Sequence, residues 1–122
     1  MGNLLLIASG GALGACVRYI LSNLVKFIHP NLPVGTFIVN ILGSFLIGVL
    51  MSNLETKNIS ETFIRNFLII GFLGSFTTFS AFSFEIVNLI NNQKIFISLF
   101  YIILSIGVCV LFAFFGYNLN KI

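Results

Sequence analysis

The chain has 122 residues, of which 58% are apolar and only 7% charged, and its mean hydropathy is +1.11. In soluble globular domains about a quarter of the residues are charged, so this composition excludes that class. The net charge of +3 forms no basic run suited to nucleic acid. A crossing needs about 20 apolar residues. We therefore expect an all-α membrane protein, a single transmembrane domain over residues 1–122 with four crossings.

The first expected span covers about residues 3–28, and one of its helix faces stands out. Gly10, Gly14 and Arg18 recur every four residues, so they share that face. The two glycines have the small-xxx-small spacing that lets another helix approach closely. A charge within a span costs about 3 kcal/mol on insertion scales and usually faces the bundle interior. We therefore predict that Arg18 pairs inside the bundle.

The second expected span, about residues 34–53, follows a loop that contains His29 and two prolines. Its polar and small residues fall at three- and four-residue spacing, on one face: Thr36, Asn40, Gly43, Ser44. An unpartnered amide in hydrocarbon costs several kcal/mol, so Asn40 must be paired to a helix, a water or an ion. Contact between helices and a role in a pore are both open for this residue.

The third expected span, about residues 63–90, contains an unusual stretch at residues 71–82. Two glycines are followed there by four hydroxyl side chains within six residues, interleaved with phenylalanine. Ser and Thr compete for the hydrogen bonds of the helix, and each Gly lowers helix propensity by about 1 kcal/mol. We therefore predict a break at residues ~74–78. Broken membrane helices bind ions through their ends and freed carbonyls.

Beyond this break, Phe79 and Phe82 are three residues apart and share a face. Glu85 continues the same face, and we expect it near the membrane interface rather than in a pair. The fourth expected span, about residues 95–117, carries a weakly polar stripe at three- and four-residue spacing: Ser98, Tyr101, Ser105, Cys109.

The two cysteines, Cys16 and Cys109, lie in apolar runs, and we expect both to be small buried hydrophobic residues. The sequence shows no Cys/His cluster that would indicate a zinc or redox site.

Positive charges at the ends of the spans show almost no bias between the two sides. One side would carry Lys57, Arg65 and Lys121, and the other Lys26 and Lys94. Orientation follows an excess of Lys and Arg on the cytoplasmic side, so a chain with so little bias can insert both ways. Two such copies can pair as an antiparallel homodimer. Glu61, four residues before Arg65, has the spacing of an exposed helix pair.

Three segments, residues 10–19, 35–45 and 71–82, together resemble the small microbial fluoride channels of the Fluc or CrcB family. The resemblance extends over nearly the whole chain. It implies a passive fluoride channel, not an enzyme, that exports cytoplasmic fluoride across the cell membrane. It also implies a dual-topology homodimer in the lipid bilayer, with two pores along the interface and a central structural Na⁺ that is not transported.

By position, the resemblance assigns the Na⁺ ligands to the backbone carbonyls of Gly74 and Thr77. It assigns the fluoride pathway to seven side chains: Phe79, Phe82, Asn40, Ser80, Tyr101, Ser105 and Thr36. Arg18, Gly10 and Gly14 match structural positions of the first segment. Ala81 and Cys109 depart from the family pattern, since related chains often carry hydroxyl groups there.

Two other functions are open. A small dual-topology multidrug exporter, coupled to protons, needs a carboxylate deep in the first span, where this chain has Arg18 and no acid. A non-conducting assembly subunit would use its polar residues only for helix packing. An intramembrane enzyme has little support, because Ser80 has no His or Lys nearby in the sequence. The choice of fluoride over chloride rests on the resemblance.

Overall fold

In the computed structural model, which describes residues 1–55 and 60–121, every regular element is a helix. Three crossings are continuous helices: α1 (Gly2–Ile28), α2 (Val34–Glu55) and α6 (Ile95–Asn118). The other long segment, Glu61–Asn91, is composite. It consists of α3 (Glu61–Phe63), the π-helix η1 (Ile64–Leu73), α4 (Gly74–Phe76) and α5 (Phe79–Asn91). A 3₁₀ turn, η2 (Leu119–Lys121), follows α6.

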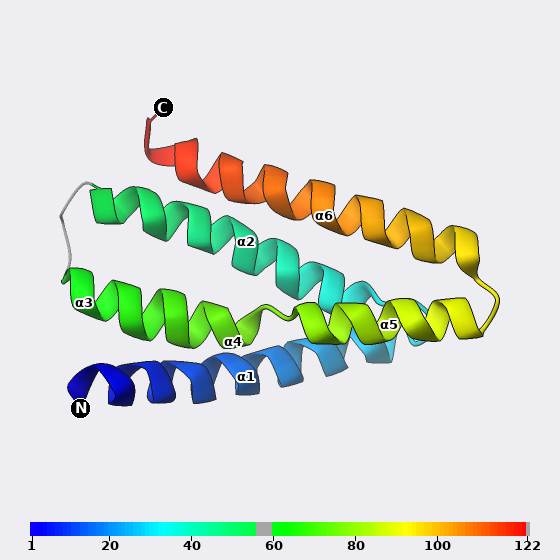
Figure 1. Ribbon diagram of the computed structural model, residues 1–122, viewed down its shortest axis with the longest axis horizontal. Coiled ribbons are helices and arrows are strands. Elements are labelled where there is room, and N and C mark those ends of the chain that lie inside the picture. Colours follow the sequence, from blue (N-terminus) through cyan, green and yellow to red (C-terminus); the bar gives the residue numbers. More distant parts are fainter. Residues whose placement is uncertain (56–59, 122) are drawn as a thin grey trace.

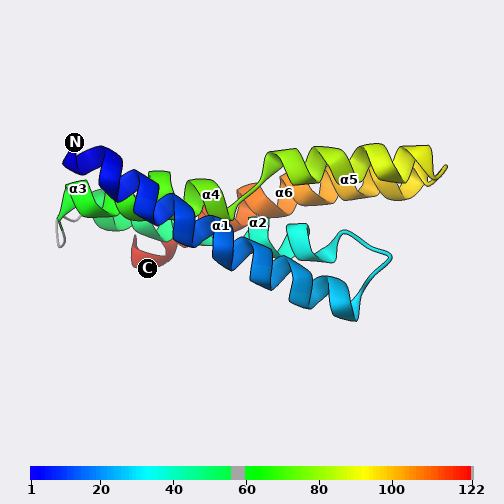
Figure 2. The ribbon, with the colours of Figure 1, turned by 90° about the horizontal axis from the view of Figure 1, so that it is seen from below.

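These four segments are long and apolar enough to cross a membrane, which fits the expected all-helical membrane protein. The N-terminus, the end of α2, the start of α3 and the end of α6 lie at one end of the bundle (Figure 1). At the other end, α5 and α6 diverge from α1 and the first turns of α2 (Figure 2). Lys57, which the charge comparison used, lies outside the described residues.

Short connections at the second end fix the order of the helices. Pro33 cannot donate a main-chain hydrogen bond, but its carbonyl accepts from the Phe37 N–H at 3.3 Å and so starts α2. Between α5 and α6, Gln93 has a φ of 60°, and the Lys94 N–H returns to the Leu89 carbonyl at 2.8 Å. This left-handed residue closes the end of α5 and reverses the chain within three residues of its last turn.

The predicted glycine face of α1 is confirmed, because α1 packs backbone to backbone against η1. Gly10 and Gly14 are buried. A Cβ atom would lie 2.2 Å from the Phe67 carbonyl oxygen at Gly10, and 2.1 Å from the Phe72 carbonyl oxygen at Gly14. Only glycine allows this approach, which positions η1 and the elements that follow it.

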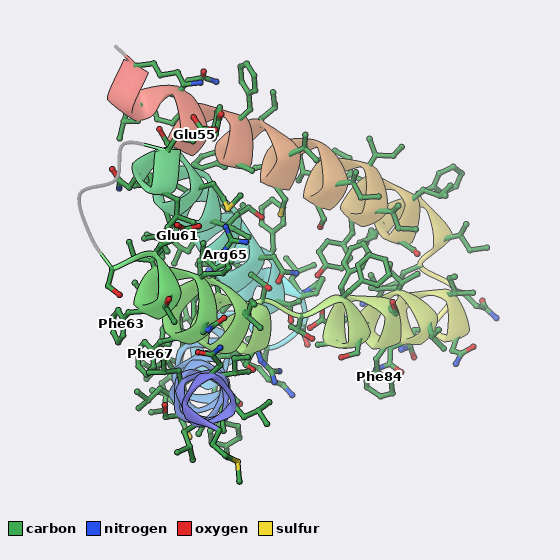
Figure 3. All side chains as sticks on the ribbon, turned by 60° about the vertical axis from the view of Figure 1, so that its left-hand side comes forward. Glu55, Glu61, Phe63, Arg65, Phe67 and Phe84 are labelled. Carbon is green, nitrogen blue, oxygen red and sulfur yellow. The ribbon has the colours of Figure 1, made fainter. Side chains whose placement is uncertain are left out.

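Most of the outer surface is apolar, and this overturns one prediction. Cys16 is exposed and Cys109 is only partly buried, so the expectation that both are buried hydrophobic residues is wrong. Phe84 of α5 likewise points away from the bundle (Figure 3). The reason is that lipid solvates apolar side chains, so an apolar residue in a membrane helix has no need to face the protein interior.

At the first end of the bundle, exposed polar contacts join the helix ends. The predicted pair of Arg65 and Glu61 is confirmed, with an N–O distance of 3.0 Å (Figure 3). The rings of Phe63 and Phe67 stack beside it with centroids 4.9 Å apart. The Tyr117 hydroxyl donates to the Glu55 carboxylate and so joins α6 to α2.

We predict that Gly14→Ala destabilises the protein by about 1–3 kcal/mol, because the added methyl group overlaps a main-chain oxygen that no side-chain rotation can move. The matched control is Gly107→Ala on α6, where a Cβ meets nothing within 4 Å. Thermal unfolding in detergent, followed by circular dichroism, should show a lower midpoint for the first variant only. Equal midpoints would contradict the close packing of α1 on η1.

Candidate ion site at the helix break

The third crossing is interrupted at Thr77 and Thr78, both in extended conformation (Figure 1). Thr77 has a ψ of 152°, and Thr78 has φ and ψ of −148° and 117°. The break is narrower than the predicted stretch of about 74–78, since Gly74–Phe76 remain helical. The Leu73 carbonyl explains this, because it accepts from both the N–H of Thr77, at 3.0 Å, and its hydroxyl, at 2.8 Å.

Asn40 of α2 holds the break open. Its amide nitrogen donates to the Thr78 carbonyl at 3.1 Å, and its amide oxygen accepts from the Thr78 N–H at 2.8 Å. The side-chain amide thus replaces both helical partners of one residue. Gly43, one turn further along α2, leaves room for the Thr77 methyl group, which would lie 2.1 Å from a Cβ there. The partner required for Asn40 is therefore the unwound main chain.

These contacts divert the usual donors of two main-chain carbonyls. In an unbroken helix, the Gly74 carbonyl would accept from the Thr78 N–H, and the Thr77 carbonyl from the Ala81 N–H. The Thr78 N–H instead donates to Asn40, and the Ala81 N–H donates to the Thr78 hydroxyl at 3.1 Å. Gly74 and Thr77 are the two positions that the family resemblance assigns to Na⁺.

Carbonyl oxygens of this kind fit a hard cation such as Na⁺. Within residues 1–55 and 60–121, no group of three His, Cys, Asp or Glu side chains lies together to hold a metal.

Arg18 fastens the break from the opposite side. Its Nε donates to the Ser75 carbonyl at 3.0 Å, which joins α1 to α4. The predicted pairing of Arg18 inside the bundle is confirmed, although its partner is a main-chain oxygen and not an acid. The Ser75 carbonyl lies near the end of α4, where a helix presents negative partial charge, so the guanidinium is favourably placed.

A groove of about 350 Å³ runs beside the break, between α2, α4, α5 and α6. Six of the predicted site residues line it: Asn40, Gly74, Thr77, Phe79, Phe82 and Ser105. The rings of Phe79 and Phe82 are in contact, with centroids 5.3 Å apart. Phe79 is 73% exposed and Phe82 only 5%, so the pair runs from the surface into the core.

Three predicted pathway residues lie outside this groove. Ser80 is exposed, and its hydroxyl is 3.2 Å from that of Thr78. Thr36 and Tyr101 are buried together around Glu85 of α5. The Thr36 hydroxyl donates to one carboxylate oxygen at 2.5 Å, and the Tyr101 hydroxyl donates to the other at 2.8 Å.

The expectation that Glu85 has no partner is therefore wrong, and sequence reasoning missed it as a site residue. Two hydroxyl donors compensate the partial burial of its carboxylate. The signal in the sequence was that Thr36, Glu85 and Tyr101 each lie a few residues inside a span next to the loop end. Glu85 also lines a second, polar cavity of about 400 Å³ between α1, α2 and α5, together with Thr36, Lys26 and Lys94. This cavity lies at the end of the bundle where α5 and α6 are joined, and we call it the mouth.

Aromatic contacts connect the groove to the Glu85 cluster. The Phe82 ring lies 5.1 Å from that of Tyr101 between centroids, and Phe37 packs edge-on against Tyr101 at 6.4 Å. A chain of aromatic contacts therefore leads from Phe79 at the break through Phe82 to Tyr101, whose hydroxyl donates to Glu85. The edge of an aromatic ring carries the positive part of its quadrupole, so such rings can offer partial positive charge without a full cation.

The fold and the site define a polytopic membrane protein built around a broken helix with an aromatic groove beside it. The chain matches the family described as "CrcB-like protein, Camphor Resistance (CrcB)" over residues 5–117, and it belongs to this family.

Curated relatives are similar in sequence to this chain over most of their length. A protein of Agrobacterium fabrum named "Fluoride-specific ion channel FluC" is 40% identical over 122 residues, which cover 99% of this chain and 98% of the relative. Proteins of the same name from Dehalococcoides mccartyi are 42% identical over 123 residues, with 100% and 95% coverage. One from Francisella tularensis is 43% identical over 107 residues, with 84% and 82% coverage.

We predict that Asn40→Ala lowers stability by about 1–3 kcal/mol, because it leaves both polar groups of the Thr78 peptide without their partner. Asn23→Ala on the exposed side of α1 is the control. Unfolding midpoints in detergent report the difference. A midpoint for Asn40→Ala no lower than that of the control would show that the amide does not hold the break.

Proposed function

We propose that this protein is a passive, fluoride-selective anion channel that lets cytoplasmic fluoride leave the cell across the cell membrane. The observation that carries this proposal is the gathering of Phe79, Phe82 and Asn40 along one groove at the helix break. Relatives that are about 40% identical over nearly the full length, and are named fluoride-specific channels, support the choice of ion.

Fluoride is small and strongly hydrated, so a pore must replace its water with several donors in series, each weak enough to release it. The groove offers the ring edges of Phe79 and Phe82, the second N–H of the Asn40 amide and the Ser105 hydroxyl. The described residues place no full positive charge among these groups. A lysine or arginine there would trap the anion.

The functional unit we propose is an antiparallel homodimer. Phe79 is 73% exposed and Gly74 is exposed beside it, so a single copy builds one wall of the route. A second copy, related by a two-fold axis, would supply the opposite wall. The small charge bias of the sequence supports opposite orientations of the two copies.

A structural Na⁺ would be held by the carbonyls of Gly74 and Thr77 from both copies. When bound, it would supply a fixed positive charge at the centre of the dimer. The residues fit this role because Asn40 and the Thr78 hydroxyl withdraw the two N–H groups that would otherwise occupy those carbonyls. Arg18 keeps the adjoining end of α4 in place.

Passive flow suits export. In an acidic medium fluoride enters as neutral HF, dissociates inside and is trapped, so an anion route is enough to release it down its gradient. The competing function is a proton-coupled exporter, with Glu85 as the proton-binding group. The position of Glu85 at the mouth of the third crossing, between two hydroxyl donors, favours an electrostatic role at the entrance over that of a central carrier.

We predict that proteoliposomes of the purified chain release fluoride, and chloride at least about a hundredfold more slowly, because a pore matched to one ion strongly disfavours another. Release should need no proton gradient and no partner protein. Ion-selective electrodes measure both anions. Equal rates for the two anions, or fluoride release that depends on an imposed pH difference, would contradict the proposal.

We also predict that Phe79→Ile and Phe82→Ile each lower fluoride release by about tenfold or more, because an aliphatic side chain lacks the positive ring edge. Phe96→Ile, on an exposed face of α6, is the matched control. Size-exclusion chromatography checks that each variant keeps the oligomeric state of the parent. Undiminished release in both groove variants would remove the phenylalanine pair from the route.

The proposed dual topology has its own test. A cysteine placed at exposed Asn3, in a background without Cys16 and Cys109, should react with a membrane-impermeant thiol reagent from both sides of the membrane. We expect about half of the copies to react from each side. Reaction from a single side would rule out the antiparallel dimer but not conduction.

A further inference from the structure

We propose that Cys109 is a thiol-modification site through which small neutral disulfides or thiosulfonates close the anion route. The inference rests on the proposed function, since it needs the groove to carry fluoride. It arises from a residue that departs from the family pattern and that the mechanism above does not use.

Cys109 lies on the wall of the same groove as the phenylalanine pair. It is a free thiol, partly exposed, and it lines the same cavity as Asn40, Phe79 and Phe82. Ser44 of α2 lines the cavity as well. The cavity of about 350 Å³ has room for a methylthio group on Cys109, which would then occupy part of the groove.

A second observation marks this part of the wall as a place for a bound group. Ser105, one helical turn before Cys109, is 6% exposed, and among the described residues its hydroxyl has no hydrogen-bond partner. Buried hydroxyl groups are nearly always paired, so an unpaired one on a cavity wall is available to a water or an ion in the groove. The permeating anion would accept from it, and a polar group attached to Cys109 could compete for the same donor.

The chemistry is a simple exchange. With methyl methanethiosulfonate, the Cys109 sulfur attacks the methylthio sulfur and forms a new S–S bond. The bond between that sulfur and the sulfonyl sulfur breaks, methanesulfinate leaves with the electron pair, and the thiol proton goes to solvent. The thiol is oxidised to a mixed disulfide and the thiosulfonate is reduced to a sulfinate. A dithiol reductant reverses the change.

Cys16 provides an internal control. It is the other free cysteine among the described residues, it is exposed on α1, and it lines neither cavity. Modification there should leave the route open.

The experiment measures fluoride release from proteoliposomes of the parent chain, Cys16→Ser and Cys109→Ser, each against its own untreated rate. After treatment with methyl methanethiosulfonate, we expect release to fall by about tenfold or more for the parent and Cys16→Ser, because an obstructed pore cannot pass ions. Dithiothreitol should restore it, and Cys109→Ser should be unaffected. Mass spectrometry of the same samples identifies the modified residue.

Three results would overturn the inference. They are an adduct on Cys109 without any change in release, an unmodified Cys109 beside a modified Cys16, and inhibition of Cys109→Ser as strong as that of the parent. Failure of the proposed function looks different, because the untreated chain would then release no fluoride. Mass spectrometry would still test the thiol in that case, since an unmodified Cys109 refutes the modification site and a modified one supports the site but not the closure of a route.

Discussion

The structure depends on one pairing, between the side-chain amide of Asn40 and the main-chain amide of Thr78. In a membrane, water is not at hand to satisfy an open stretch of backbone, so a helix can unwind only where protein groups take over its hydrogen bonds. Asn40 presents one donor and one acceptor in the geometry of a peptide, and so it does this for Thr78. The consequence is transmitted to Gly74 and Thr77, whose carbonyls lose the N–H groups that a continuous helix would give them. The same contact that stabilises the break therefore also diverts the usual donors of these two carbonyls.

A break is useful only if its position is fixed, and here it is held from two sides. On the α2 side Asn40 grips Thr78, and Gly43 makes room for the Thr77 methyl group. On the α1 side Arg18 donates to the Ser75 carbonyl, and close packing against Gly14 fixes the position of η1 along α1. The ten residues of η1 are wound as a π-helix, which is rarely so long and frequently occurs at functional sites. This winding brings main-chain carbonyls of η1 directly against the glycines of α1.

Much of this could be predicted from the sequence, because in an apolar chain each glycine, amide or charge needs a specific reason. The glycine face of α1, the inward pairing of Arg18 and the presence of a break followed from spacing and elementary energetics. Two features could not be predicted. The pairing of Glu85 with Thr36 and Tyr101 depends on contacts 49 and 16 residues apart in the chain, which local patterns do not encode. The exposure of Cys16 was missed because hydrophobicity does not distinguish a residue facing lipid from one facing protein.

The two phenylalanines of the groove differ strongly in burial, and this difference bears on whether one copy of the chain is enough. Phe82 is packed against Tyr101 and belongs to the core of a single copy, whereas Phe79 stands 73% exposed beside the carbonyls of the break. An exposed phenylalanine in contact with lipid would need no explanation. Phe79, however, lies next to unwound main chain, and polar backbone at that depth must be covered by protein or face a water-filled cavity. Either outcome requires a second wall across the groove. The proposed second copy meets this requirement with the same residues, since a two-fold axis through the break would place each Phe79 and each Gly74 opposite its counterpart.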